Sequence, residues 1–227
     1  MLENYKIGGE MITFAEELLL LALDDEKGKF YSMPFMTLEY ALVGAILMEL
    51  ALKNRLETDQ EHLIIVNDAP TGDALFDKVL QIISQEPKTL NAKFWIREIS
   101  KAIPNLKDIL LERLIAKGII KKSEHKILWV FSERCYPTLD DKEVKEVRTR
   151  IREIVLSDNI PNPRDIALIT LLDTCNLIDK IFSKEELERA EKRIEQIAKM
   201  DLIGQALSQA VSDVYKMVNL AVAAEPD

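Results

Sequence analysis

The stretch E-L-A-L-K-N-R-L-E-T-D-Q-E-H-L-I-I-V-N-D-A-P-T-G-D at residues 49–73 is echoed by R-L-I-A-K-G-I-I-K-K-S-E-H-K-I-L-W-V-F-S-E-R-C-Y-P-T-L-D at residues 113–140. Self-similarity of this kind predicts a repeated structural unit. Asn54 in the first copy corresponds to Gly118 in the second, and both residue types tolerate the left-handed conformation that closes a helix. The unit therefore reads as a helix, a tight exit, a short hairpin and another helix.

The second copy contains an apolar run that is typical of a β-strand. Residues 121–124 form a polar turn in this interpretation, and the run I-L-W-V-F follows at strand length, rich in β-branched and aromatic residues. Alternation along a strand places Ile127, Trp129 and Phe131 on one face, and Leu128 and Val130 on the other. Both faces are apolar, so both need cover from the protein's own core, a partner chain or a membrane.

The chain as a whole predicts a mainly α-helical, compact multi-helix single domain with two small β-hairpins. It has 227 residues, of which 48% are hydrophobic, enough to bury a sizeable core. Thr13 and Glu16 form a capping box before a helix that is apolar on every side, which predicts deep burial. The closing helix near residues 204–223 has an apolar side typical of a core helix. We expect an N-terminal segment at 1–10 and the domain at 11–227.

Composition and motifs argue against several functions. A net charge of −9 disfavours a general polyanion binder, because nucleic-acid affinity rests on clustered Lys and Arg. The longest uncharged apolar stretches are about half of what a bilayer span requires. Cys135 and Cys175 show no metal-ligand spacing, and His62 and His125 occupy matching slots of the repeat, which a shared fold explains. We therefore expect no catalytic residue, no metal and no cofactor.

Two classes of binding protein remain open from these patterns. A helix followed by a hairpin is also the last part of a winged helix, which would make the protein a DNA-binding regulator. The helix at 105–118 offers Lys107, Arg113 and Lys117, but Asp108 and Glu112 balance that charge. The other class is a peripheral membrane or protein-interaction module, with or without lipid binding.

Four blocks in order carry a resemblance to a known family. They are T-F-A-E-E-L-L-L at 13–20, G-A-I-L-M-E-L-A-L at 44–52, D-A-P-T-G-D at 68–73 and L-I-A-K-G-I-I at 114–120. Together they resemble the Golgi phosphoprotein-3 family, over essentially the whole chain from about residue 11. The resemblance implies a mostly helical fold, binding to membranes rich in phosphatidylinositol 4-phosphate, recognition of short cytosolic tails of Golgi enzymes, and a hairpin at 123–134 used for self-association or membrane contact.

The chain departs from the lipid pocket that the resemblance implies. The family's better-known members carry a tryptophan where this chain has Pro34, with Phe35 adjacent, and arginines where it has Val43, Pro104 and Lys107. Lysine supplies a point charge without the planar fork of arginine. With the missing long N-terminal extension, these departures favour a divergent family member, for which a prokaryotic source is one option.

The resulting prediction is a non-enzymatic peripheral membrane protein and adaptor, cytoplasmic and placed at the Golgi membrane if its source is eukaryotic. Its expected partners are an anionic, phosphoinositide-like lipid, client proteins and a further copy of itself bound through the hairpin, with no nucleic acid. The residues expected to bind the lipid headgroup are Phe35, Lys101, Lys107, Lys121 and Lys122. The residues expected to contact the membrane or a second copy are Ile127, Leu128, Trp129, Val130 and Phe131.

Overall fold

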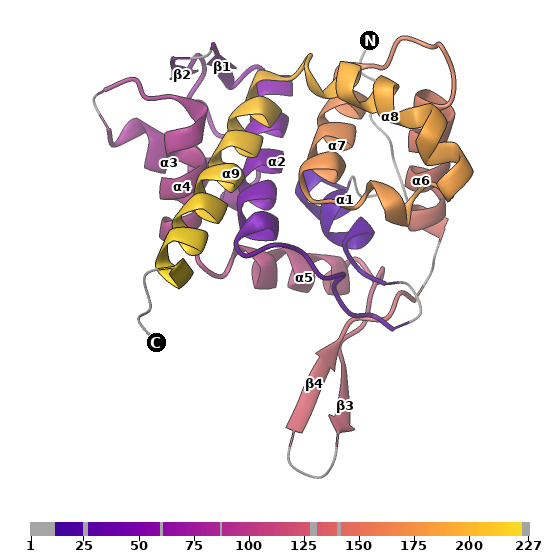
Figure 1. Ribbon diagram of the computed structural model, residues 1–227. Helices are drawn as coiled ribbons and strands as arrows, with labels where there is room; N and C mark the ends of the chain where they lie inside the picture. The colour runs from indigo at the N-terminus through magenta and orange to yellow at the C-terminus, as the bar shows by residue number, and fades with distance from the viewer. Residues whose placement is uncertain are drawn as a thin grey trace.

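A long buried helix, α2 (Thr37–Leu52), forms the centre of the fold, and other helices surround it (Figure 1). The structure is a computed structural model that describes residues 12–24, 27–59, 61–86, 88–127, 131–139 and 142–223. The remaining elements are α1 (Phe14–Leu21), β1 (Leu56–Thr58), β2 (Leu63–Ile65), α3 (Ala74–Ser84), α4 (Ala92–Ala102), α5 (Leu106–Ala116), β3 (Ser123–Ile127), β4 (Phe131–Cys135), α6 (Lys142–Val155), α7 (Pro163–Thr174), the 3-10 helix η1 (Ile178–Lys180), α8 (Lys184–Ala198) and α9 (Leu202–Ala223). The predicted mainly helical fold with two hairpins is confirmed.

The innermost helices are those whose sequences are apolar all round. Every residue of α1 is buried, and its predicted capping box is present, with the Thr13 hydroxyl accepting from the Glu16 amide. Helix α2 packs against α1, α4, α5, α7 and α9. Helix α9 is the expected core helix, and the Cβ of an alanine at Gly204 would lie 2.1 Å from the Thr170 methyl group, so α7 and α9 cross in close contact.

The two copies of the repeat end their first helices in the same way. Asn54 has a φ of 54° and Gly118 a φ of 71°. The next residue donates its amide to a carbonyl inside the helix in both copies, Arg55 to Leu50 at 2.9 Å and Ile119 to Leu114 at 3.0 Å. This Schellman closure turns the chain toward β1 after α2 and toward β3 after α5. The predicted equivalence of Asn54 and Gly118 is therefore confirmed.

The strand predicted for the apolar run is wrong in its position. The first strand of the second hairpin already begins at Ser123, in the predicted turn, and Ile127 and Phe131 pair across the two strands. Ile127 therefore ends β3 and Phe131 begins β4, whereas the sequence analysis placed both in one strand. Backbone pairing with a partner segment decided the register, which the apolarity of a single run cannot supply. Leu128, Trp129 and Val130 lie outside the described residues.

The two histidines do not occupy matching positions. His62 lies in the turn that precedes β2, where its amide donates to the Asp59 carboxylate at 2.6 Å. His125 lies within β3 and pairs with Glu133. The strands of the second hairpin are longer than those of the first. The Glu-His pair of each repeat therefore lies in the turn of the first hairpin but within a strand of the second.

Candidate membrane-binding surface

An aromatic loop, residues 27–36, connects α1 to α2 along the edge of the domain from which the β3–β4 hairpin projects (Figure 1). The loop is tied to the base of that hairpin, since the Tyr136 amide donates to the Gly28 carbonyl at 2.6 Å. Gly28 has a φ of +60°, and a Cβ there would lie 2.5 Å from the Pro137 nitrogen. Only glycine fits this crossing, so loop and hairpin base form one connected surface.

Two lysines from distant parts of the chain lie over aromatic rings of this loop. The Lys107 ammonium group, in the first turn of α5, lies 5.3 Å from the centre of the Phe30 ring. The Lys180 ammonium group, in η1, lies 5.5 Å from the centre of the Tyr31 ring. Lys180 also donates to Asp179 at 2.6 Å, and this hydrogen bond raises the pKa of Lys180. Cation–π contacts therefore place an ammonium group over each of two rings of the loop, and one of these groups, that of Lys180, is also paired with Asp179.

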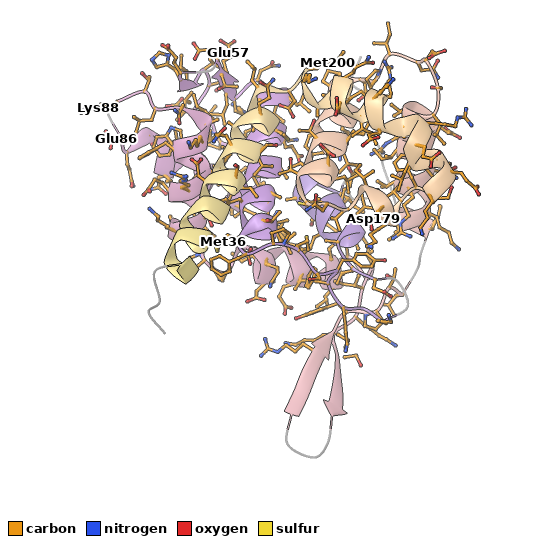
Figure 2. All side chains as sticks on the ribbon, viewed as in Figure 1. Met36, Glu57, Glu86, Lys88, Asp179 and Met200 are labelled. Atoms are coloured by element: carbon orange, nitrogen blue, oxygen red, sulfur yellow. The ribbon has the colours of Figure 1, made fainter. Side chains whose placement is uncertain are left out.

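Phe35 is an exposed aromatic residue at the end of the aromatic loop. Its side chain is 71% exposed, although aromatic residues are usually covered in a folded protein. The next residue, Met36, is the N-cap of α2 and has a φ of 61°, a left-handed conformation that is strained for a residue other than glycine. Figure 2 shows Met36 at the edge of the domain that carries the hairpin. The turn thus presents an uncovered aromatic ring to the outside.

The other predicted lysines lie at the two ends of α5. Lys101 is exposed in the last turn of α4, just before α5, and pairs with Glu98 at 2.6 Å. Lys121 and Lys122 are exposed between α5 and β3. Helix α5 runs along the hairpin edge in Figure 1, and its length of about 16 Å follows from a rise of about 1.5 Å per residue. The structure thus places Lys101 before α5 and Lys121 and Lys122 after it, and Lys101 is paired with a carboxylate.

The positions of the implied lipid pocket do not form a phosphate site. Val43 lies inside α2 and is fully buried, so the valine side chain does not reach the surface. Pro104 is exposed in the turn between α4 and α5, and of these positions only Lys107 is cationic. Lys180 was missed by the sequence analysis because its place beside Tyr31 depends on how α7 and η1 pack. No local pattern in the sequence marks it.

The charges on α5 disfavour the DNA-binding alternative. The two terminal guanidinium nitrogens of Arg113, Nη1 and Nη2, each donate to one carboxylate oxygen of Asp73 at 2.7 Å. Lys117 donates to both oxygens of the buried Glu16 carboxylate at 2.8 Å. The other charged side chains of α5 are those of Lys107, Asp108 and Glu112, so the helix offers no cluster of cations for a DNA groove.

In the part of the chain that the structure describes, no helix has the length and hydropathy needed to cross a membrane. Among the described residues, no three His, Cys, Asp or Glu side chains lie close enough together to bind a metal ion.

This helical domain, with its projecting hairpin and its aromatic loop between cations, falls into a known class of protein. Residues 14–214 match the family described as Golgi phosphoprotein 3 (GPP34). The chain belongs to this family.

Two fungal relatives are named vacuolar protein sorting-associated protein 74. The one from Eremothecium gossypii is 27% identical over 215 residues, covering 80% of this chain and 64% of the relative. The one from Schizosaccharomyces pombe is 24% identical over 205 residues, covering 79% of this chain and 60% of the relative. The chain thus spans less than two thirds of the length of these relatives.

Proposed function

We propose that the protein is a peripheral membrane adaptor that binds anionic lipid, such as a phosphoinositide, through the edge formed by the aromatic loop, α5 and the base of the β3–β4 hairpin. Its place would be the cytoplasmic face of the Golgi if the source is eukaryotic, and its role would be to hold client proteins at that membrane without catalysis. Membership of the Golgi phosphoprotein 3 family supports this role. The observation that carries it is the exposed Phe35 in a loop flanked by Lys107 and Lys180.

The proposed surface combines the two forces that hold peripheral proteins on a bilayer. Each lysine near an anionic membrane contributes about 1 kcal/mol, so several must act together. Burying a phenylalanine side chain contributes about 1.5–3 kcal/mol. Phe35 inserted among headgroups with Lys107, Lys180, Lys121 and Lys122 around it would give reversible, charge-dependent binding. Ile127, Leu128, Trp129, Val130 and Phe131 of the hairpin would add apolar contact with the membrane or with a second copy.

The expected lipid preference follows from the use of lysine in place of arginine, because lysine cannot make two parallel hydrogen bonds to one phosphate group. A buried Val43 and exposed Pro104 leave the chain without bidentate phosphate contacts at those positions. We therefore expect binding to rise with the negative charge of the vesicle. A phosphoinositide should bind better than phosphatidylserine mainly because each headgroup carries more charge.

Vesicle co-sedimentation tests the proposal. The vesicles contain phosphatidylcholine alone, or with phosphatidylserine, or with phosphatidylinositol 4-phosphate. We expect binding to the two anionic mixtures, and a loss of about tenfold for Phe35→Ser, since about 1.4 kcal/mol corresponds to that factor. Ile160→Ser is the matched control, because Ile160 is 95% exposed in the connection between α6 and α7. The lipid role fails if no vesicle binds, or if both substitutions weaken binding equally.

The lysines need their own control. Lys107→Ala combined with Lys180→Ala removes both cations beside the aromatic loop, whereas Lys88→Ala removes an exposed lysine on a different side of the domain (Figure 2). The double variant should lose most binding to anionic vesicles, and Lys88→Ala should keep it. If wild-type protein binds no vesicle and Trp129→Ala changes only the mass of the oligomer, the protein is a soluble interaction module.

A further inference from the structure

One face of the β3–β4 hairpin carries an exposed arginine, Arg134, close to the aromatic loop. Arg134 lies in β4 and Tyr136 follows two residues later, so the two side chains lie on the same face, opposite to the buried Cys135. The Tyr136 ring packs against Phe30 on this face, with the ring centres 6.4 Å apart. Because Phe30 belongs to the aromatic loop, Arg134 is on the hairpin face that adjoins this loop.

The pairing of the two strands places a lysine, Lys122, on the same face. The backbone pairs before and after Lys122 share one register, and this register puts Lys122 opposite Tyr136 and Glu124 opposite Arg134. Lys122 and Arg134 are therefore diagonal neighbours across the hairpin, and such neighbours lie about 7–8 Å apart. Both residues are exposed, so the hairpin offers two cations to a ligand that approaches this face.

The pair of rings formed by Phe30 and Tyr136 lies between a lysine of α5 and this arginine. The Lys107 ammonium group lies 5.3 Å from the centre of the Phe30 ring. Burial raises the pKa of Tyr136, whereas the charge of Arg134 and a hydrogen bond with its side chain lower it. The structure therefore has an ammonium group beside Phe30 and a guanidinium group beside the Tyr136 hydroxyl.

Two carboxylates of α5 offset part of the positive charge at this place. The negative charges of Asp108 and Glu112 raise the pKa of Tyr136, so both act at the same hydroxyl group as Arg134. The attraction of a diffuse negative surface charge to the ring pair is weakened accordingly. A contact with a defined hydrogen-bond geometry then contributes a larger share of the binding.

Arg134 is the cation of this group that can form such a contact. A guanidinium group presents five N–H donors in a planar fork that matches two phosphate oxygens, whereas the ammonium groups of Lys107 and Lys122 act as point charges. One hydrogen bond with Tyr136 leaves most of the Arg134 donors for a ligand. A phosphate monoester on an inositol ring projects from the headgroup and presents several oxygens to such a fork.

We propose that Arg134 binds the phosphate monoester of a phosphoinositide headgroup through two parallel hydrogen bonds, with Lys107 and Lys122 supplying charge on either side. This inference rests on the proposed function, because it concerns the same membrane surface, and it names the chemical group that this surface recognises. It adds a preference for the monoester to the preference that follows from the charge of the vesicle.

Co-sedimentation with vesicles of matched surface charge tests the inference. One mixture contains phosphatidylinositol 4-phosphate, and the other contains enough phosphatidylinositol, which has the same ring without the monoester, to give the same surface charge. We expect the wild type to bind the first mixture about tenfold more tightly, because hydrogen bonds to a charged group are strong. Arg134→Lys keeps the charge and removes the fork, so it should bind both mixtures alike. Arg189→Lys is the matched control, since Arg189 is exposed on α8, and it should keep the preference.

The possible results separate this inference from the proposed function. The role of Arg134 is overturned, and the proposed function stands, if the wild type binds both charge-matched mixtures equally or if Arg134→Lys keeps the preference. Wild-type protein that binds neither mixture would overturn both. Inorganic phosphate at the concentration of the lipid phosphate should displace no protein from the vesicles. Displacement would show a site for free phosphate and would also overturn the role of Arg134 in lipid recognition.

Discussion

Replacing Lys117 by methionine should destabilise the fold strongly, because it leaves a buried carboxylate without its counter-charge. Glu16 is fully buried in α1, and the Lys117 ammonium group at the end of α5 lies 2.8 Å from both of its carboxylate oxygens. Removing one partner of a buried ion pair costs about 3–5 kcal/mol. Glu16 keeps two hydrogen bonds from Thr13, at 2.8 Å and 2.9 Å, so we expect a loss near the lower limit, about 3 kcal/mol.

Urea and thermal unfolding measure this loss. In a domain of this size, about 3 kcal/mol corresponds to a fall of roughly 6–12 °C in Tm. Lys121→Met is the matched control, since Lys121 is exposed and its loss should change stability by less than about 0.5 kcal/mol. Glu16→Gln combined with Lys117→Met should cost less than the sum of the two single changes, because the double variant leaves no buried charge. The reasoning is refuted if Lys117→Met costs less than about 1 kcal/mol, or if the two changes add.

Three further predictions concern single sites. Gly118→Val should lower the free energy of unfolding in urea by about 1–2 kcal/mol, because Gly118 has a left-handed φ of 71°. Asn54→Gly should not lower it. Equal losses of stability in the two variants would contradict this reasoning. Hydrogen bonds from Lys93 and Gln209, with the nearby Arg97, lower the pKa of Asp213 to about 2, so its charge stabilises the fold above about pH 4 and this contribution is lost as the pH falls toward 2. Asp213→Asn should therefore lower Tm at pH 7, and the Tm of this variant should approach that of the wild type near pH 2. A difference in Tm that stays constant with pH would contradict a stabilising interaction of the Asp213 charge with Lys93 and Arg97. Burial raises the pKa of Cys175 to about 12, so iodoacetamide at pH 8 should leave Cys175 unmodified in the folded protein, as read by peptide mass spectrometry, and should modify it in urea.

Features set by neighbouring residues were predictable from the sequence. The capping box at Thr13 and the helix closures at Asn54 and Gly118 depend on a few adjacent residues, and the structure has all of them. The strands of the second hairpin were misplaced because pairing depends on a second segment, which the apolar run beginning at Ile127 does not identify.

The candidate surface was predictable only in part for the same reason. Phe35 and Lys107 could be named from their places in the chain, and the structure exposes Phe35 and puts the Lys107 ammonium group over the Phe30 ring of the same loop. The cation beside Tyr31 comes from Lys180, far along the chain, and it reaches the loop only through the packing of α7 and η1. Side chains that meet through tertiary packing leave no common pattern in the sequence.

The backbone crossing at Gly28 joins two surface features that are more than 100 residues apart in the chain. A carbon atom added at Gly28 would lie 2.5 Å from the Pro137 nitrogen, so the loop and the hairpin base touch backbone to backbone at this point. A side chain at residue 28 would push the two segments apart. If the loop and the hairpin contact one bilayer, as proposed, such a substitution would therefore change the depth of one relative to the other.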